Sequence, residues 1–291
     1  MHTVAGCLLW AQQTLASADA AEAVLKRSAP VDSRWLLCHV LQRNSAWLKA
    51  WPEAEVSAQR WQQYQRLVER RKQGEPVAYL TGEQGFWSLE LEVSAATLVP
   101  RADTELLVET ALQLSTEDSI DVLDLGTGTG AVALALKSER PGWRITATDV
   151  DDATVQLARR NSERCQLPIH IIQSDWFANI PPHQFHVIVS NPPYIETDDP
   201  HLQGVGVRFE PLRALVSGKD GLDAIREIVR KAGDYLRYDG WLLIEHGFQQ
   251  GEAVREIYAR NGFASVATLR DLADNERLTM GCWKKDLKHV E

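Results

Sequence analysis

The sequence predicts an α/β protein in which a small helical domain precedes a mostly parallel sheet that ends in an antiparallel pair of strands. From residue 120 onward, strand-like segments alternate with amphipathic helical segments, the pattern of parallel strands joined by crossover helices. Before residue 75 the apolar residues recur at helical spacing instead. We therefore divide the chain into a helical domain at 1–74, a β-hairpin linker at 75–100 and an α/β domain at 101–291.

The composition of the chain argues against several classes of protein. Of the 291 residues, 44% are hydrophobic and 24% are charged, which is ordinary for a soluble globular chain. The net charge of −9 argues against a direct nucleic-acid partner. The four cysteines form no CxxC pair and the histidines show no metal-ligand spacing, so we expect free thiols in a reducing cytoplasm and no metal. We find no secretory signal and no apolar run of membrane-spanning length, and expect neither export nor a membrane partner.

Three helices are expected in the amino-terminal domain. The first carries Val4, Cys7, Leu8 and Leu15 on one face. The second is expected to start near Pro30, because proline is favoured at helix starts, and the third to run from Ser57 to Gln73 before Gly74. The domain is rich in tryptophan, and packing in a small core is favoured over docking of another protein for these residues: Trp10, Trp35, Trp47, Trp51 and Trp61.

A hairpin and a charged turn connect this domain to the sheet. Apolar and polar residues alternate from Phe86 to Val93, which predicts the two strands of the hairpin. A helix should then open after Pro100 and run to about Leu114. Its first turn contains charged residues for which a plain solvated turn is favoured over a pocket wall: Arg101, Asp103 and Glu105.

The remaining segments follow the α/β pattern in order. Strands are expected at 120–125, 144–148, 169–173, 186–190 and 241–245, and helices at 131–137, 153–165, 220–237 and 249–260. Segments 262–269 and 278–283 are expected to form the closing antiparallel pair.

A glycine loop follows the first of these strands. It reads Gly126, Thr127, Gly128, Thr129, Gly130, and such a loop between strand and helix lets the backbone approach a ligand closely. Asp149 lies about 20 residues onward, at a spacing that suits a ribose diol. The glycine loop and Asp149 together predict an adenosine-containing cofactor. They also satisfy the dinucleotide-binding pattern, so an NAD enzyme stays an alternative.

Two features favour S-adenosylmethionine over NAD. Asp124, just before the loop, could pair with an amino acid's ammonium group but would repel a pyrophosphate. With S-adenosylmethionine bound, Asp175 and Trp176, which end the third strand, could flank its adenine by a hydrogen bond and by stacking. The second feature is the turn that ends the fourth strand, because this turn has no use in hydride transfer.

That turn is Asn191, Pro192, Pro193, Tyr194, directly after a strand expected to be buried. The two prolines stop the strand rigidly and place Asn191 at its carboxyl end, where α/β sheets bind ligands. The side-chain oxygen of Asn191 and the carbonyl of Pro192 could hold the hydrogens of a planar amino group, with Tyr194 offering it a flat face. This arrangement suits alkyl transfer to nitrogen by positioning. A proline turn with Asn191 as a mere cap is the alternative.

The chain resembles the peptide chain release factor glutamine methyltransferases, the PrmC/HemK family. The resemblance is carried by V-L-D-L-G-T-G-T-G, A-T-D-V-D, S-D-W and V-S-N-P-P-Y-I, with L-V-P-R-A-D-T-E-L-L-V-E before them and R-F-E-P-L-R-A-L-V-S-G-K-D-G-L after them. Together with the length of the helical domain, these motifs cover nearly the whole chain. One departure is Ala102, where many relatives have a second proline.

The resemblance implies a class I, Rossmann-like methyltransferase sheet and an amino-terminal domain that docks the substrate. It implies transfer of a methyl group from S-adenosylmethionine to the glutamine amide of a Gly-Gly-Gln motif in class 1 release factors, with S-adenosylhomocysteine as product. Family cofactor residues map onto 126–130, Asp149, Trp176 and Asn191, and substrate residues onto 191–194. His246 receives no role. The alternatives are a methyltransferase for adenine N6 or guanine N2 in nucleic acids and a non-catalytic cofactor-binding adaptor.

Overall fold

The structure, a computed structural model, describes residues 2–17 and 23–284 of the chain. It contains two compact units. The first comprises Met1–Glu83 with Pro200–Phe209, and the second comprises Gln84–Asp199 with Glu210–Glu291. The functional division at residues 74 and 100 stays a prediction. Within the described ranges, every helix is too short or too polar to cross a membrane.

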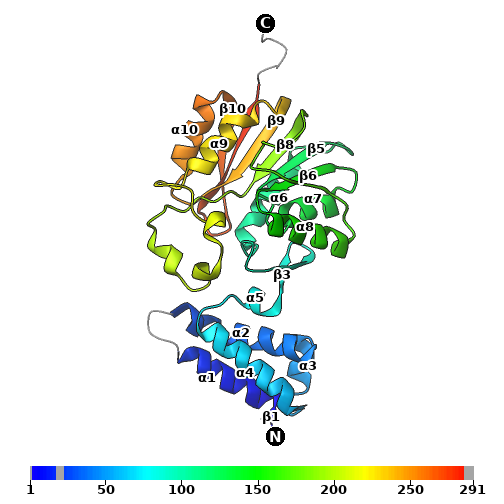
Figure 1. Ribbon diagram of the computed structural model, residues 1–291, viewed down its shortest axis with the longest axis vertical. Helices are drawn as coiled ribbons and strands as arrows, with labels where there is room; N and C mark the ends of the chain where they lie inside the picture. Colours follow the sequence, from blue (N-terminus) through cyan, green and yellow to red (C-terminus); the bar gives the residue numbers. More distant parts are fainter. Residues whose placement is uncertain (1, 18–22, 285–291) are drawn as a thin grey trace. The chain divides into compact units, whose positions relative to one another are not determined.

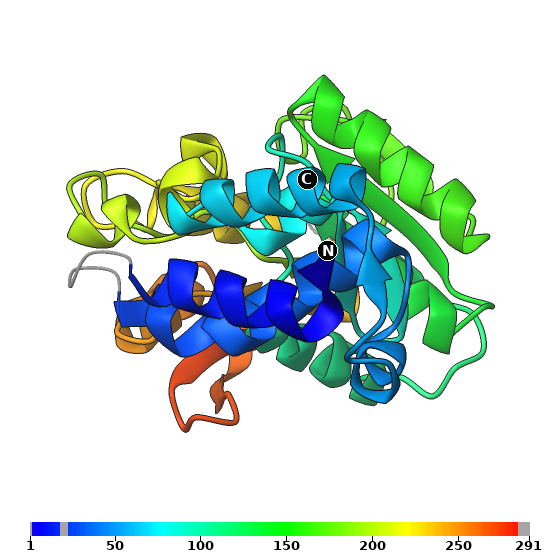
Figure 2. The same cartoon turned by 90° about the horizontal axis from the view of Figure 1, so that it is seen from below.

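Three long helices build the first unit: α1 (Val4–Ala16), α2 (Ala23–Leu41) and α4 (Ala58–Lys72). They pack pairwise, and α1 and α4 lie side by side (Figures 1 and 2). Their buried faces supply a shared apolar core that includes Val4, Leu15, Leu36 and Val68. The predicted helical domain is confirmed. Its smaller elements, which periodicity did not predict, are β1 (His2–Thr3), α3 (Ser45–Ala50), β2 (Glu55–Val56), α5 (Val77–Thr81) and the 3₁₀ turns η3 (Pro200–Gln203) and η4 (Val207–Phe209).

The predicted start of the second helix at Pro30 is wrong. Helix α2 begins at Ala23 and carries Pro30 inside it. Leu25 and Ala29 are both buried, so the apolar face continues upstream of the proline. Burial of that extra turn offsets the backbone hydrogen bond that Pro30 cannot donate.

The tryptophans of the first unit fall into two groups. Trp10, Trp47 and Trp61 are partly buried and pack against the helical core, as the core interpretation predicts. Trp35 and Trp51 are not core residues, because 63% and 60% of their surfaces are exposed. Exposed tryptophans are rare enough in soluble proteins to suggest a binding surface.

We expect Tyr64→Phe to lower the free energy of unfolding by about 1 kcal/mol. The Tyr64 side chain is fully buried, and its hydroxyl donates to the Ser33 carbonyl at 2.9 Å, which links α4 to α2. Chemical denaturation followed by fluorescence measures the change. The matched control is Tyr238→Phe, which removes an exposed hydroxyl of the second unit and should change nothing. Equal stability of the two variants would show that the buried bond contributes little.

A seven-stranded sheet forms the centre of the second unit, in the order β10-β11-β9-β8-β5-β6-β7. Strands β5 (Asp121–Leu125), β6 (Arg144–Asp149), β7 (His170–Gln173), β8 (Phe185–Ser190) and β9 (Leu236–Glu245) pair in parallel. Strands β10 (Phe263–Arg270) and β11 (Glu276–Trp283) are antiparallel to each other, and β11 is antiparallel to β9. The predicted mostly parallel sheet with its antiparallel end is confirmed.

Helices cover both faces of this sheet (Figure 1). One face packs on α6 (Glu105–Gln113), α7 (Ala131–Glu139) and α8 (Asp152–Cys165), and the other on α9 (Asp223–Ala232) and α10 (Gly251–Arg260). Adjacent residues of one strand serve opposite layers; Val187 and Val189 belong to the first and Ile188 to the second. This is why the central strands are apolar runs without polar alternation.

Several predicted boundaries are corrected. The helix expected at 220–237 is only Asp223–Ala232, and the strand expected at 241–245 begins at Leu236. Gly233, the residue after this helix, lies close against the Trp283 ring, because a Cβ there would lie 2.4 Å from the ring. The hairpin is confirmed as β3 (Glu83–Phe86) with β4 (Leu89–Glu92), and two further 3₁₀ turns, η2 (Ala102–Thr104) and η5 (Leu212–Ala214), border the site.

Candidate active site

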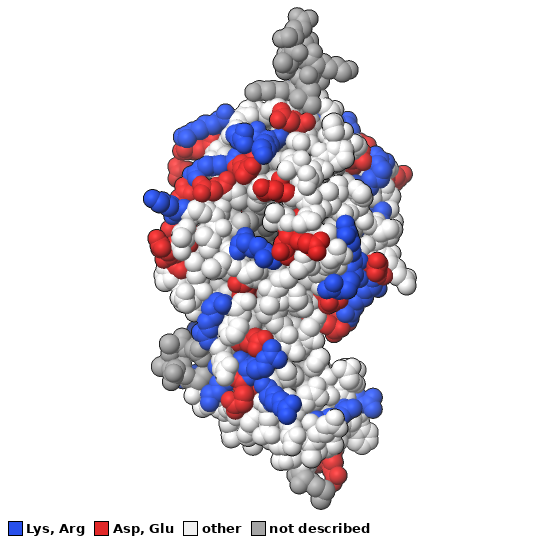
Figure 3. Space-filling model, viewed as in Figure 1, with Lys and Arg blue, Asp and Glu red and all other residues white. Residues whose placement is uncertain are grey.

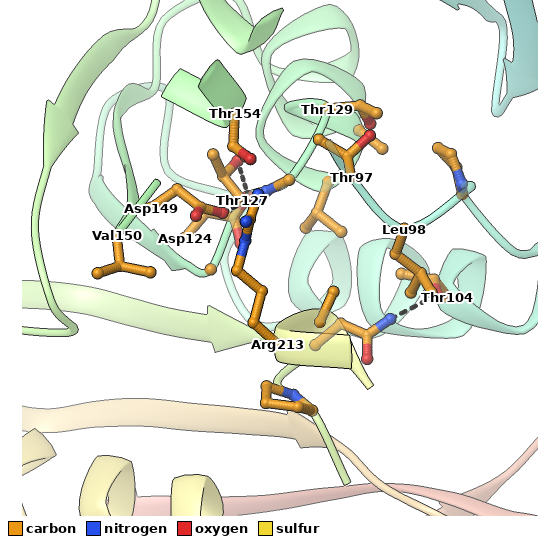
Figure 4. Close-up of a pocket in the computed structure, with 18 of the residues that line it drawn as sticks. Thr97, Leu98, Thr104, Asp124, Thr127, Thr129, Asp149, Val150, Thr154 and Arg213 are labelled. Carbon is orange, nitrogen blue, oxygen red and sulfur yellow. Dashed lines mark hydrogen bonds between the residues drawn. The ribbon is translucent and has the colours of Figure 1, made fainter. Parts of the chain in front are cut away.

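One pocket of the second unit gathers most of the residues singled out in the sequence. It lies at the carboxyl ends of β5, β6 and β8, the edge at which open α/β sheets bind ligands (Figure 4). The residues that sequence reasoning placed there and the structure also places there are Asp124, Gly126, Thr127, Gly128, Thr129, Asp149, Asp175, Trp176, Asn191 and Pro193. Gly130, Pro192 and Tyr194 are not among its lining residues.

The glycine loop is tied to the end of β6. The backbone N–H of Thr127 donates to the Thr148 carbonyl at 2.8 Å, so the loop folds over the neighbouring strand. Gly126 has φ +69°, and a Cβ at this position would lie 3.4 Å from the Trp176 ring. A side chain here would therefore strain the backbone and crowd the ring that borders the pocket.

Asp124 fits a cationic ligand group. Its side chain is 2% exposed, and burial raises its pKa to about 7 against a 2.6 Å hydrogen bond from the Thr127 hydroxyl that favours the charged form. A buried carboxyl with a pKa of about 7 is stabilised in its charged form when a positive charge comes next to it. An ammonium group in the pocket supplies such a charge, and a pyrophosphate does not.

The Asp149 carboxylate is oriented so that it can accept hydrogen bonds from a diol. Its carboxylate oxygens accept the backbone N–H groups of Gly128 at 3.0 Å and Asp151 at 3.2 Å. Burial raises its pKa, and these two backbone donors lower it. Each oxygen has a further lone pair, so the carboxylate is fixed in orientation and still able to accept from a ligand.

Asn191 presents an unpaired acceptor. Its Nδ2 donates to Thr104 Oγ1 at 3.0 Å, the bond drawn at Thr104 in Figure 4. Its Oδ1 is buried and has no hydrogen-bond partner among the described residues. An unpaired buried acceptor is costly, so a native site that holds one in a ligand pocket is built for a donor that arrives with the ligand.

Tyr194 is half-buried and is not among the residues that line the pocket. Its ring packs with the core formed by α9 and α10, and its hydroxyl donates to Glu245 Oε1 at 3.4 Å. Its carbonyl accepts from Gln250 Nε2 at 2.9 Å. Gly221 makes room for this carbonyl, since a Cβ there would lie 2.2 Å from it. The Tyr194 ring is only partly buried, and its role toward a planar substrate group stays a prediction.

Two basic side chains border the pocket: Arg101, for which a pocket wall was the less favoured interpretation, and Arg213, which sequence reasoning missed. Arg101 pairs with buried Glu210 at 2.5 Å and lines the pocket, so the interpretation of its turn as merely solvated is wrong at this residue. Arg213, on η5, pairs with Asp151 at 2.8 Å and donates to the Ala96 carbonyl at 2.9 Å. Both contacts join segments far apart in the sequence, and only the presence of R-F-E-P-L-R among the family motifs pointed toward Arg213. Asp103 pairs instead with Arg277, and Glu105 accepts the Trp87 backbone N–H.

His246 is held in the protein interior by contacts of both ring nitrogens. It is buried, with Nδ1 2.9 Å from the Gly247 carbonyl and Nε2 2.9 Å from Thr279 Oγ1. Burial lowers its pKa, which favours the neutral ring.

Comparison with known proteins agrees with this geometry. The model of the "PrmC N-terminal domain" matches residues 7–82 and that of the "Methyltransferase small domain" matches 101–206. The "Release factor glutamine methyltransferase" of Pseudomonas aeruginosa is 52% identical over 88% of this chain and 93% of its own. That of Shewanella oneidensis is 46% identical over 96% of both chains. The chain belongs to the release factor glutamine methyltransferase family.

The solved structures support the fold of this family member. A methyltransferase from Pyrococcus furiosus aligns over 76% of this chain and 98% of its own, with a TM-score of 0.53 and 19% identity. At that identity the likeness establishes the class I methyltransferase fold and nothing finer. The predicted fold class is confirmed, and a non-catalytic adaptor is disfavoured by the family.

Proposed function

We propose that the protein methylates the side-chain amide nitrogen of the glutamine in the Gly-Gly-Gln motif of class 1 peptide chain release factors. The observation that carries the proposal is the buried Asn191 Oδ1, which lacks a hydrogen-bond partner among the described residues and borders the pocket. Family membership supplies the substrate class. The amide nitrogen is a poor nucleophile because its lone pair is delocalised, so the reaction needs positioning more than a strong base.

S-adenosylmethionine, when bound, supplies a methyl group on a sulfonium sulfur and leaves as S-adenosylhomocysteine. Asp149 is the residue for its ribose, Asp124 for its ammonium group, and Asp175 and Trp176 border the space for its adenine. Asn191 Oδ1 accepts one hydrogen of the substrate amide and, with the Pro192 carbonyl, holds the nitrogen toward the methyl carbon. Methyl transfer would form a C–N bond at the amide nitrogen and break the C–S bond with its electron pair going to sulfur, and the proton lost from the nitrogen would pass to water.

The charge distribution favours a protein substrate over a nucleic acid. On the face in Figure 3 basic and acidic side chains are interspersed, and the chain carries a net charge of −9. A nucleic-acid methyltransferase needs a basic surface to neutralise phosphates. Mass spectrometry of purified release factor after incubation with the protein and labelled S-adenosylmethionine tests the proposal. One labelled methyl on the Gly-Gly-Gln glutamine is expected, and faster labelling of duplex DNA or RNA would overturn it.

Asp149→Ala should weaken S-adenosylmethionine binding about tenfold or more, since it removes an acceptor for two ribose hydroxyls. Isothermal calorimetry with S-adenosylmethionine and with NAD measures both affinities. Asp118→Ala, a change in a loop outside the pocket, serves as the control and should leave binding unchanged. Tighter binding of NAD, or an unchanged affinity in Asp149→Ala, would contradict the cofactor assignment.

A further inference from the structure

Asn191 lies next to a group of buried polar side chains. Thr104, the last residue of η2, is 5% exposed and accepts the Asn191 Nδ2–H. Glu245, at the end of β9, is 2% exposed and accepts the Tyr194 hydroxyl through Oε1. Glu245 Oε2 has no well-formed hydrogen bond to a described residue, and the Thr104 side chain lies beside this carboxyl and favours its charged form.

The direction of the hydrogen bonds among Thr104, Glu245 and Asn191 follows from the number of protons that each side chain can donate. A threonine hydroxyl has one proton to donate and two lone pairs to accept with. When the Thr104 proton points to the Glu245 carboxylate, the hydroxyl can only accept from Asn191. Asn191 must then turn its NH₂ to Thr104 and its Oδ1 to the pocket. The opposite direction would turn the Asn191 NH₂ toward the substrate amide, which also presents hydrogens.

We propose that Thr104 and Glu245 are positioning residues that fix Asn191 with its oxygen toward the substrate nitrogen. This inference rests on the proposed function and adds to it the residues that set the polarity of the acceptor. Neither side chain touches the reacting atoms. Both act through Asn191, and the Tyr194 hydroxyl donates to Glu245 Oε1.

The surroundings of Glu245 act on its charge in opposite directions. Complete burial raises its pKa to about 7, and the Thr104 and Tyr194 hydroxyls and the Arg277 charge lower it, while Asp103 raises it. Arg277 itself is held by Asp271 at 3.3 Å and Asp103 at 3.5 Å. Burying a carboxylate destabilises the core unless the carboxylate accepts hydrogen bonds, so the presence of Glu245 here argues for a function.

Four variants test the inference, each assayed for kcat and KM on intact release factor, for the Kd of S-adenosylmethionine and for Tm. Thr104→Val keeps the shape but removes the hydroxyl, and we expect kcat to fall about tenfold with an unchanged Kd. Thr104→Ser keeps the hydroxyl and should restore kcat to within about twofold of the wild type. The matched control is Thr110→Val on α6, which loses a buried hydroxyl bonded to the Leu106 carbonyl at 2.7 Å and should leave kcat unchanged.

Glu245→Gln is the fourth variant and the safeguard if Thr104→Val fails to fold. Glutamine has one acceptor oxygen in place of two, so one of the two hydroxyls must face an NH₂, and kcat should again fall about tenfold. A kcat of Thr104→Val within twofold of wild type, or a Thr104→Ser variant as slow as Thr104→Val, would overturn the positioning role. If Thr104→Val does not fold, a normal kcat for Glu245→Gln overturns it. Failure of the wild type to label release factor would instead overturn the proposed function.

Discussion

Replacing Asn191 by alanine should lower kcat for release factor methylation by about a hundredfold or more, because small misplacements of reacting groups cost that much. The change removes Oδ1, the buried acceptor that lacks a partner among the described residues. Without it, one hydrogen of the substrate amide has no acceptor, and the nitrogen lone pair is free to turn from the methyl carbon. Binding of S-adenosylmethionine should change far less, since Asp149 and the glycine loop hold separate parts of it.

Asn191→Asp separates the two functions of this side chain. Aspartate keeps an oxygen where the acceptor stands but has no NH₂ to donate to Thr104. We expect a kcat between those of the wild type and Asn191→Ala. Single-turnover assays at saturating cofactor measure the chemical step, and calorimetry measures the Kd of the cofactor alongside. A normal single-turnover rate in Asn191→Ala would remove Asn191 from the mechanism.

Local patterns predicted the sheet and most of the pocket. Each central strand is an apolar run and each parallel crossover a helix, so the order of elements could be derived from periodicity. Because parallel strands end at one edge, Asp124, Asp149 and Asn191 were expected at that edge, and the structure brings all three to one pocket. Pro30 shows the limit of such signals, since burial of Leu25 and Ala29 overrides the local preference for a helix start.

Partners distant in the sequence could not be predicted this way. Thr104 lies 87 residues from Asn191, and Glu245 lies 51 residues from Tyr194. Nothing in the sequence around Glu245 distinguishes it from a surface acid at a strand end; only the fold shows that it is buried. Arg101 likewise looked like a solvated residue until the packing placed Glu210 beside it.

Selectivity for one glutamine must come from outside the pocket. A side-chain amide occurs on every glutamine, so the acceptor at Asn191 cannot distinguish between them, and discrimination requires further contacts. We propose that the exposed Trp35 and Trp51 of the first unit supply such contacts to a folded release factor. Tryptophan is the residue type most enriched among interface residues that dominate binding energy. Two linked contacts strengthen each other through effective concentration.

The Trp35→Ala and Trp51→Ala variants should each raise KM for intact release factor about 30-fold, as for the loss of an interface residue worth about 2 kcal/mol. Neither should alter kcat/KM for a short Gly-Gly-Gln peptide, which reaches only the pocket and should be a poor substrate for every form. Leu272→Ala, at a fully exposed loop of the second unit, is the control.

Point substitutions test this better than deletion of residues 1–74, because Pro200–Phe209 clusters with the first unit and Gly206 N donates to the Gly74 carbonyl at 3.0 Å. Deletion would therefore remove the packing of that segment together with the tryptophans. An unchanged KM for intact factor in both tryptophan variants, with folding intact, would show that these side chains do not dock the substrate. A peptide methylated as well as the intact factor would show that no docking surface is needed, and selectivity would then have to come from the pocket walls alone.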